Sequence, residues 1–167
     1  MAFFRLRRQW VLETVMKQRQ KSQEIHVAAA EEVEQMRARA KAELPVRLAE
    51  LAERYGFTYN RVAIKHNSTN WGSCSTKSNI NLNLNIVRLP YVLRDYILLH
   101  ELCHLRHHDH GQGFHLLLEH VLTDNLLKLV DAKDEIALQL ARKAAVSKAK
   151  YPADYVMTRA VKQYRLI

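Results

Sequence analysis

Between Asn79 and Ile86, polar and apolar residues alternate without an exception. Successive side chains of a strand point to opposite faces, so this segment predicts a half-buried strand with its isoleucines and leucines directed inward. Two shorter strands are expected at 61–66 and 71–75, with a turn at 76–78 before the alternating segment. The simplest assembly of the three is a small antiparallel sheet.

Long helical segments flank this sheet. Residues 11–54 contain no glycine and are rich in Ala, Glu, Gln, Lys and Arg, which favours a helix. Pro45 is expected to break or kink this helix near Leu44, and Gly56 is expected to end it. Further helices are expected over residues 91–107, 113–129 and 133–148, with a last short element in 154–167. The fold class is therefore α+β, with long helices flanking a small sheet.

Length and composition indicate one compact domain. The chain has 167 residues, and only four are glycine and three proline, which excludes collagen-like and low-complexity classes. Within this domain we expect an N-terminal helical arm (1–56), a core (57–130) and a C-terminal helical extension (131–167).

Cysteine content, apolar runs and charge indicate the setting in which the chain works. Two cysteines are too few for a disulfide framework, and Met1–Trp10 carries no secretory signal, so the expected location is cytoplasmic. No apolar run approaches the roughly 20 residues that cross a bilayer, so no membrane partner is expected. The net charge of +9 is spread along the chain, which is typical of a solvated surface and leaves nucleic acid as an alternative partner.

The main chemical signal is His100-Glu101-Leu102-Cys103-His104, within a segment expected to be helical. Residues i and i+4 face the same way on a helix, so His100 and His104 can bind one metal ion. Glu101 can then reach the metal-bound water as a general base. The apolar residues that precede His100 place this group beside a core, where a cation offsets the cost of burying imidazoles and a carboxylate.

A catalytic zinc ion usually takes three protein ligands, so one more residue is required. Three ligands at i, i+4 and i+7 stack along one axis, which disfavours His107. His110 is favoured, because Gly111 and Gly113 allow the chain to turn back after the helix. The alternatives that stay open are His107, His108, Glu119 and Asp124.

Several separate motifs resemble, in order and spacing, the YgjP-like metallopeptidase family, whose neighbours are the SprT-like proteases. They are Trp71–Ser75, Ile80, Leu82-Asn83, Leu89-Pro90, Asp95-Tyr96, His100–Leu105 and His110–Phe114, within about residues 60–120. The resemblance implies a zincin-like fold and a divalent metal held by His100, His104 and His110, with Glu101 as catalytic base. Asp109 and His115 depart from the family pattern. Because SprT-like proteases act on proteins attached to DNA, the resemblance also makes the basic charge worth testing.

The function expected from these features is a zinc-dependent hydrolase with one ion per chain, most simply a peptidase that acts on peptides or proteins. The alternative is a nucleic-acid-associated protein whose metal only holds the fold.

Other residues near the expected site have two interpretations. Trp71–Cys74 is either an edge strand that aligns substrate or part of the core, and the asparagines of 79–85 form a solvated sheet face rather than a binding site. Cys74 and Cys103 are expected to be small buried residues and not ligands. The donor that stabilises the oxyanion stays open among Tyr96, His108 and His115.

Overall fold

A computed structural model describes residues 2–167, with side chains from Arg5 onward. The residues form two compact units, 1–37 and 38–167, and helix α1 (Ala2–Tyr55) runs through both. In the first unit most side chains are exposed, including the large apolar side chains of Leu6, Trp10 and Met16. All groups considered below belong to the second unit. The division into an arm, a core and an extension stays a prediction.

Helix α1 passes through Pro45 without ending, so the expected break there is wrong. Proline removes one backbone donor, which costs helix stability. In residues 38–55 the apolar side chains of Ala40, Leu44, Leu48 and Leu51 recur every three or four residues and are all buried. Burial of this face offsets the loss at Pro45. The helix ends where expected, at a glycine with positive φ (Gly56, φ 75°).

The sheet has three strands in the order β1-β3-β2: β1 (Arg61–Lys65), β2 (Gly72–Cys74) and β3 (Asn79–Asn83). β2 and β3 are antiparallel, as expected, whereas β1 runs parallel to β3. The sheet is therefore mixed rather than wholly antiparallel. β3 is the strand with the strictest alternation, and its Ile80 and Leu82 are fully buried, so it takes the centre and separates β1 from β2.

β3 ends earlier than the alternation suggests, because residues Leu84–Arg88 form a 3-10 turn, η1. The side chain of Asn83 accepts a hydrogen bond from the backbone N–H of Asn85 (2.9 Å) and so begins this turn. Both asparagines are buried, so the expected solvated face is wrong for these two residues. Their amides bond to the chain itself and fix the corner after the sheet.

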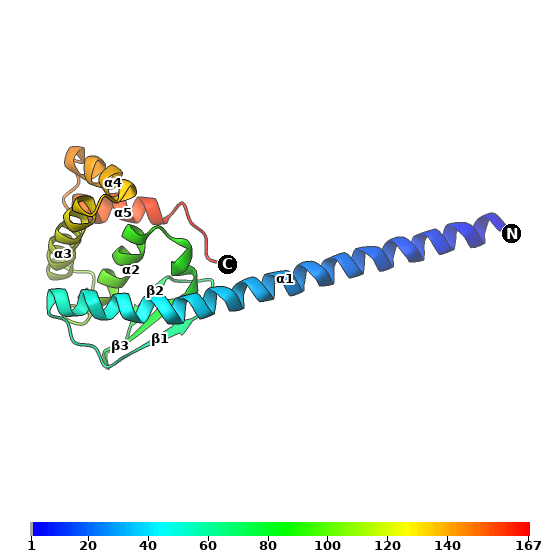
Figure 1. Cartoon of the computed structure of the whole chain (residues 1–167), viewed down its shortest axis with the longest axis horizontal. Helices are drawn as coiled ribbons and strands as arrows, with labels where there is room; N and C mark the ends of the chain where they lie inside the picture. Colours follow the sequence, from blue (N-terminus) through cyan, green and yellow to red (C-terminus); the bar gives the residue numbers. More distant parts are fainter. Residues whose placement is uncertain (1) are drawn as a thin grey trace. The chain divides into compact units, whose positions relative to one another are not determined.

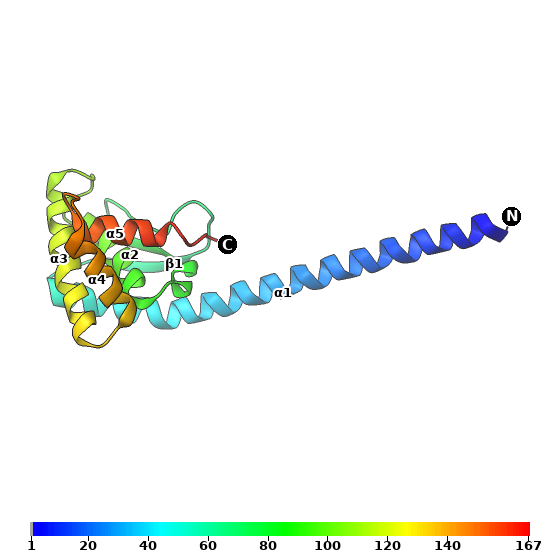
Figure 2. The same ribbon diagram turned by 90° about the horizontal axis from the view of Figure 1, so that it is seen from above.

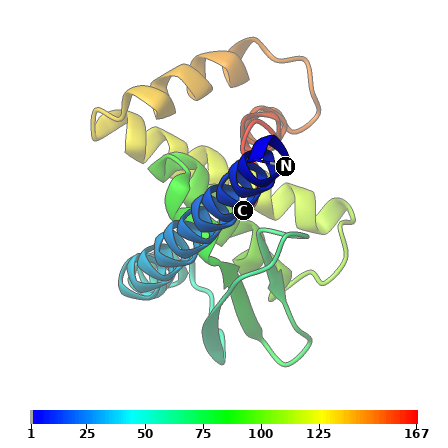
Figure 3. The ribbon, with the colours of Figure 1, turned by 90° about the vertical axis from the view of Figure 1, so that its right-hand side faces the viewer.

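Four helices complete the second unit: α2 (Tyr91–His104), α3 (Gln112–Asp131), α4 (Glu135–Val146) and α5 (Pro152–Val161). Helix α2 contacts β2 and β3 on one side and α3 and α5 on the other. In Figure 1 the sheet lies below α2, α3 lies beside it, and α4 and α5 lie above it; Figure 3 shows the strands and α4 at opposite ends of the unit. The α+β class is confirmed, with α2 at the centre of the unit. In the described part of the chain, no helix is both long and apolar enough to cross a membrane.

A buried carboxylate joins three of these helices. Asp95 of α2 is 2% exposed and accepts hydrogen bonds from Nε and an NH2 nitrogen of Arg47 on α1, at 2.9 and 2.7 Å. The side-chain amide of Asn125 on α3 donates a third bond to it, at 2.9 Å. A buried charge is tolerated when it is paired and hydrogen-bonded, and these bonds fix the orientation of α2.

Candidate metal centre

Helix α2 presents His100 and His104 on one face, one turn apart. Their Nε2 atoms lie 3.3 Å from each other. The helix runs without interruption from Tyr91 to His104, and its apolar residues Leu98, Leu99 and Leu102 are fully buried. Burial of these leucines holds α2 in place, which in turn fixes the direction of the two imidazoles.

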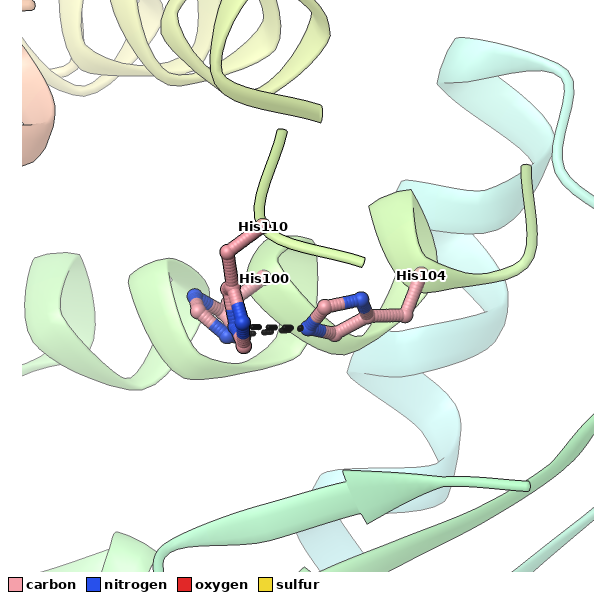
Figure 4. Close-up of side chains that lie close together, drawn as sticks. All are labelled: His100, His104 and His110. Carbon is pink, nitrogen blue, oxygen red and sulfur yellow. Dashed lines mark hydrogen bonds between the residues drawn. The ribbon is translucent and has the colours of Figure 1, made fainter. Parts of the chain in front are cut away.

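His110 reaches the same point from the loop that follows α2. Its Nε2 atom lies 3.2 Å from Nε2 of His104, and Figure 4 shows the three imidazoles converging. The loop turns because the Asp109 carboxylate accepts a hydrogen bond from the Gly111 N–H (3.1 Å), so Asp109 shapes the turn. At Gly113, a Cβ atom would lie only 2.8 Å from Cε1 of His107. Glycine therefore allows α3 to begin close to the end of α2.

The three imidazoles fit a small cation. Nitrogens that share a tetrahedral ion at about 2.0–2.1 Å lie about 3.3–3.4 Å apart, close to the two distances seen here. Nδ1 of His104 lies 2.8 Å from the carbonyl oxygen of His107. A carbonyl only accepts, so Nδ1 carries the proton and donates it, which leaves the Nε2 lone pair of His104 directed at the centre of the group. Histidines 100, 104 and 110 form a group that could hold a metal ion.

An aromatic side chain closes one side of this group. Phe114 of α3 is 1% exposed, its ring stacks on His104 at 4.3 Å between centroids, and it lies edge-on to His100 and His110. Burial lowers the pKa of His100 to about 4, and neighbouring imidazoles add to the effect. Burial also lowers the pKa of His104. Both rings are therefore neutral near pH 7, the form that binds a metal.

Glu101 follows His100 on α2 and faces a cavity beside the imidazoles. Its side chain is 6% exposed and makes no hydrogen bond to another residue in the described range. Burial raises its pKa to about 7. A carboxyl group of this kind can take up and release a proton near neutral pH.

The other residues considered as third ligands are engaged elsewhere. The Glu119 carboxylate accepts hydrogen bonds from the N–H groups of Ala153 and Asp154 at the start of α5. Asp124 accepts a hydrogen bond from Tyr55 (2.7 Å). His107 packs against Gly113, and His108 is exposed on the loop. These four side chains lie outside the group, and so do Cys74 and Cys103.

A cavity of about 730 Å³ lies beside His100 and Glu101. Its lining includes Trp71 and Gly72 of the β2 region, Tyr96 and Ile97 of α2, and residues from the end of α5 and the segment that follows it. Of the three candidates for the oxyanion donor, Tyr96 is the one that lines this cavity. Its hydroxyl, however, lies 3.0 Å from the Asp154 carboxylate and 2.7 Å from the Thr158 hydroxyl. Since Thr158 also lies 3.2 Å from that carboxylate, the Tyr96 proton is committed to this trio.

Comparison with known proteins agrees with this site. Residues 6–128 match the YgjP-like metallopeptidase domain. The chain belongs to the YgjP-like metallopeptidase family. Membership in the YgjP-like family makes it a metallopeptidase, with a metal ion and peptide substrates. The match also extends the resemblance, found at residues 60–120, over most of helix α1 and into α3.

No curated protein matches the chain. Among solved structures, the crystal structure of the metallopeptidase zymogen of Pyrococcus abyssi abylysin is similar at 19% identity, with a TM-score of 0.45. The similarity covers 72% of this chain and 95% of that one.

Sequence reasoning missed two parts of this YgjP-like site. Phe114 lies within the motif that carried the resemblance, but its position against all three imidazoles depends on how α3 packs on α2. Lys162 and residues 164–166 line the cavity although they follow the matched region, and their sequence carries no motif. The hydrogen bonds that hold this segment, from Asn85 to Ile167 and from Arg88 to the carbonyl of Arg165, could be found only from the fold.

Proposed function

We propose that this metallopeptidase is zinc-dependent, with His100, His104 and His110 as the ligands of one ion and Glu101 as the general base. The convergence of the three Nε2 atoms beside a buried, unpartnered carboxylate is the observation that carries the proposal. Three neutral imidazoles are the donor set of many catalytic zinc sites, and three protein ligands leave one position open.

The residues of the chain divide the chemistry between them. When bound, zinc acts as a Lewis acid that polarises the substrate carbonyl and lowers the pKa of a coordinated water molecule. Glu101 accepts a proton from the attacking water and delivers it to the leaving amine. Its buried position supports its role as a base, because burial raises the pKa of the carboxyl group above that of an exposed glutamate. Phe114 keeps water away from one side of the imidazoles.

Strand β2 supports a peptide substrate in extended form. β2 lies at the edge of the sheet, and its bonds to β3 use the carbonyl of Trp71 and the N–H of Ser75. Backbone groups of an antiparallel strand alternate in direction, so those of Gly72 and Cys74 face away from β3. This free edge borders the cavity beside Glu101 at Gly72, where an extended peptide could add as a further strand.

Metal content measured by mass spectrometry tests the ligand set. We expect about one zinc ion per chain in untagged wild type, loss of zinc in His110→Ala and retention in Glu119→Ala, whose carboxylate caps α5 instead. Zinc lost equally in both variants would contradict the proposed ligands.

The role of Glu101 is tested separately. Glu101→Gln is expected to keep zinc and lose peptide hydrolysis, because the amide cannot accept the proton. Unchanged turnover in this variant would exclude Glu101 as the base.

Two expectations stay predictions. The cytoplasm remains the predicted compartment, because both cysteines are free thiols and free thiols fit a reducing environment. A nucleic-acid partner remains an alternative, and binding that weakens steeply with salt and persists in Glu101→Gln would favour it.

A further inference from the structure

Part of the lining of the cavity beside Glu101 consists of residues that follow α5. We call residues 162–167 the tail. Within it, Lys162, Tyr164, Arg165 and Leu166 line the cavity, together with Thr158 and Val161 of α5. Figure 2 shows the tail leaving α5 on the side where the loop between β1 and β2 lies. A substrate that fills this cavity beside Glu101 therefore lies next to the tail.

The tail is held in place by a buried side chain. Asn85 is fully buried, and its amide bonds to both backbone groups of Ile167: Oδ1 accepts from the N–H (3.0 Å), and Nδ2 donates to the carbonyl (3.1 Å). His66 adds a contact to the same carbonyl (2.6 Å), and Arg88 donates to the carbonyl of Arg165. Three side chains from the sheet side thus fix the backbone of the tail, so its side chains have a defined place at the cavity.

Two cations of the tail have no acidic partner. Lys162 and Arg165 are exposed, and neither forms an ion pair with a described residue. The rest of the lining is mostly apolar or neutral. Among the described residues, Glu101 is the only acidic side chain that lines the cavity, and Asp154 is already hydrogen-bonded to Tyr96 and Thr158. The cavity therefore has a positive wall that the chain itself does not neutralise.

We propose that Lys162 and Arg165 bind a carboxylate of the peptide substrate, so that the enzyme prefers peptides with an acidic group close to the scissile bond. This inference rests on the proposed peptidase function. A carboxylate within reach of two unpaired cations gains charge-assisted hydrogen bonds, and the partly enclosed cavity screens them less than open solvent does. The apolar side chains of Val161 and Leu166 beside them favour the aliphatic part of the same substrate residue.

Binding to an inactive variant tests the proposal without relying on turnover. Zinc-loaded, full-length Glu101→Gln is titrated with fluorescent peptides in matched pairs that differ by Glu or Gln at one of three positions on either side of the central bond. We expect the best acidic peptide to bind about tenfold more tightly than its neutral partner, the effect of two partly exposed ion pairs. Equal binding of all pairs would overturn the proposal.

Charge reversal assigns the preference to the tail. Lys162→Glu/Arg165→Glu, placed in the Glu101→Gln background, is expected to abolish or invert the preference. The matched control is Arg142→Glu/Lys143→Glu on α4, which makes the same change in net charge away from the cavity. A preference lost equally in both double variants would show a long-range effect of net charge and overturn the assignment to Lys162 and Arg165.

The source of the carboxylate is resolved by a second set of peptides. Peptides with a free or an amidated C-terminus but no acidic side chain test a terminal carboxylate, and amidated peptides with internal Glu or Gln test a side-chain carboxylate. A preference in either set that depends on the two cations supports the proposal, and the set that shows it identifies the group.

Turnover by wild type separates this inference from the proposed function. Hydrolysis of acidic and neutral peptides at equal rates, with equal binding, would support the peptidase and overturn the carboxylate preference. Selective binding of acidic peptides without hydrolysis of any peptide would support the carboxylate site and contradict the peptidase.

Discussion

Gly72 of β2 lies so close to Glu101 of α2 that a Cβ atom at Gly72 would be 3.1 Å from the Cγ atom of the glutamate. The same Cβ would also lie 3.1 Å from the backbone carbonyl of Asn81 in β3. Because Gly72 has no side chain, the edge strand leaves the space that the Glu101 side chain occupies.

Gly72→Ala is therefore expected to lower turnover about tenfold or more, because the added methyl group moves the Glu101 carboxylate. Zinc content should stay near one per chain, since none of the three imidazoles touches this position. Steady-state hydrolysis together with metal analysis checks this, and Ser73→Ala, one residue along on the exposed side, is the control. Full activity in Gly72→Ala would show that the glutamate can shift without cost.

Glu101 also makes the stability of the metal-free protein depend on pH. Its pKa is about 7 in the folded state and about 4.5 in the unfolded chain, so between these values the folded state binds more protons. The contribution of Glu101 to the free energy of unfolding therefore decreases as pH rises from about 4.5 to 7. Glu101→Gln removes this cost. The free energy of unfolding of the variant, relative to that of wild type, should therefore be about 2–3 kcal/mol higher above pH 7 than below pH 4.5.

Urea unfolding in the presence of a chelator, from pH 4.5 to 8, measures this difference. A stability difference between the two proteins that is constant with pH would contradict the burial of an ionisable carboxyl group at this position.

Loss of Arg47 should destabilise the protein more than loss of an exposed cation. Arg47→Met leaves the Asp95 carboxylate buried with Asn125 as its remaining partner, at an expected cost of about 3 kcal/mol. Lys128→Met removes an exposed pair with Asp124 and should cost less than about 1 kcal/mol. Denaturant unfolding of both variants checks the comparison. Similar losses would show that the Arg47–Asp95 pair contributes no more than a surface pair.

Phe114→Leu should weaken zinc binding without removing a ligand. The smaller side chain leaves space beside the His104 ring and admits water to the imidazoles, so we expect an affinity about tenfold lower. Competition with a zinc chelator measures it, and Leu116→Ala, exposed on the same helix, serves as the control. Unchanged affinity in Phe114→Leu would assign the ring to the core alone.

Pro45→Ala should raise stability, because the helix already runs through this position. Alanine restores a backbone donor and the better helix propensity, and the loss of proline's restriction on the unfolded chain offsets part of the gain. We expect about 1–2 kcal/mol in the free energy of unfolding. A decrease would show that the surrounding turn is shaped to the proline ring.

Short-range patterns predicted the fold where local rules suffice. The placement of His100 and His104 on one face follows from their i, i+4 spacing and helix geometry. The turn that brings His110 back has another cause than the one expected, because Gly111 has an ordinary φ of −77° and the Asp109 side chain makes the turn. The path of α1 through Pro45 cannot be predicted from local rules, since it depends on burial of Leu44 and Leu48 in the folded unit. The parallel pairing of β1 with β3 is likewise a long-range contact, and alternation alone carries no information about strand direction.

The position of Asn85 shows the same limit. Its alternation with apolar neighbours predicted a solvated residue, yet its side chain bonds to Ile167, 82 residues further along the chain. Propensity does not encode such a partner, and the tail wall of the cavity depends on it.

The three imidazoles of the proposed metal centre lie within eleven consecutive residues, 100–110. Closing so short a loop costs little entropy, so the unfolded chain can also gather these side chains around a zinc ion. Zinc should therefore raise the free energy of unfolding by less than its affinity for the folded protein implies, because part of the binding persists after denaturation. We also expect zinc to speed refolding. An unfolded chain that has already bound zinc through these histidines begins to fold with the end of α2 and the start of α3 close together.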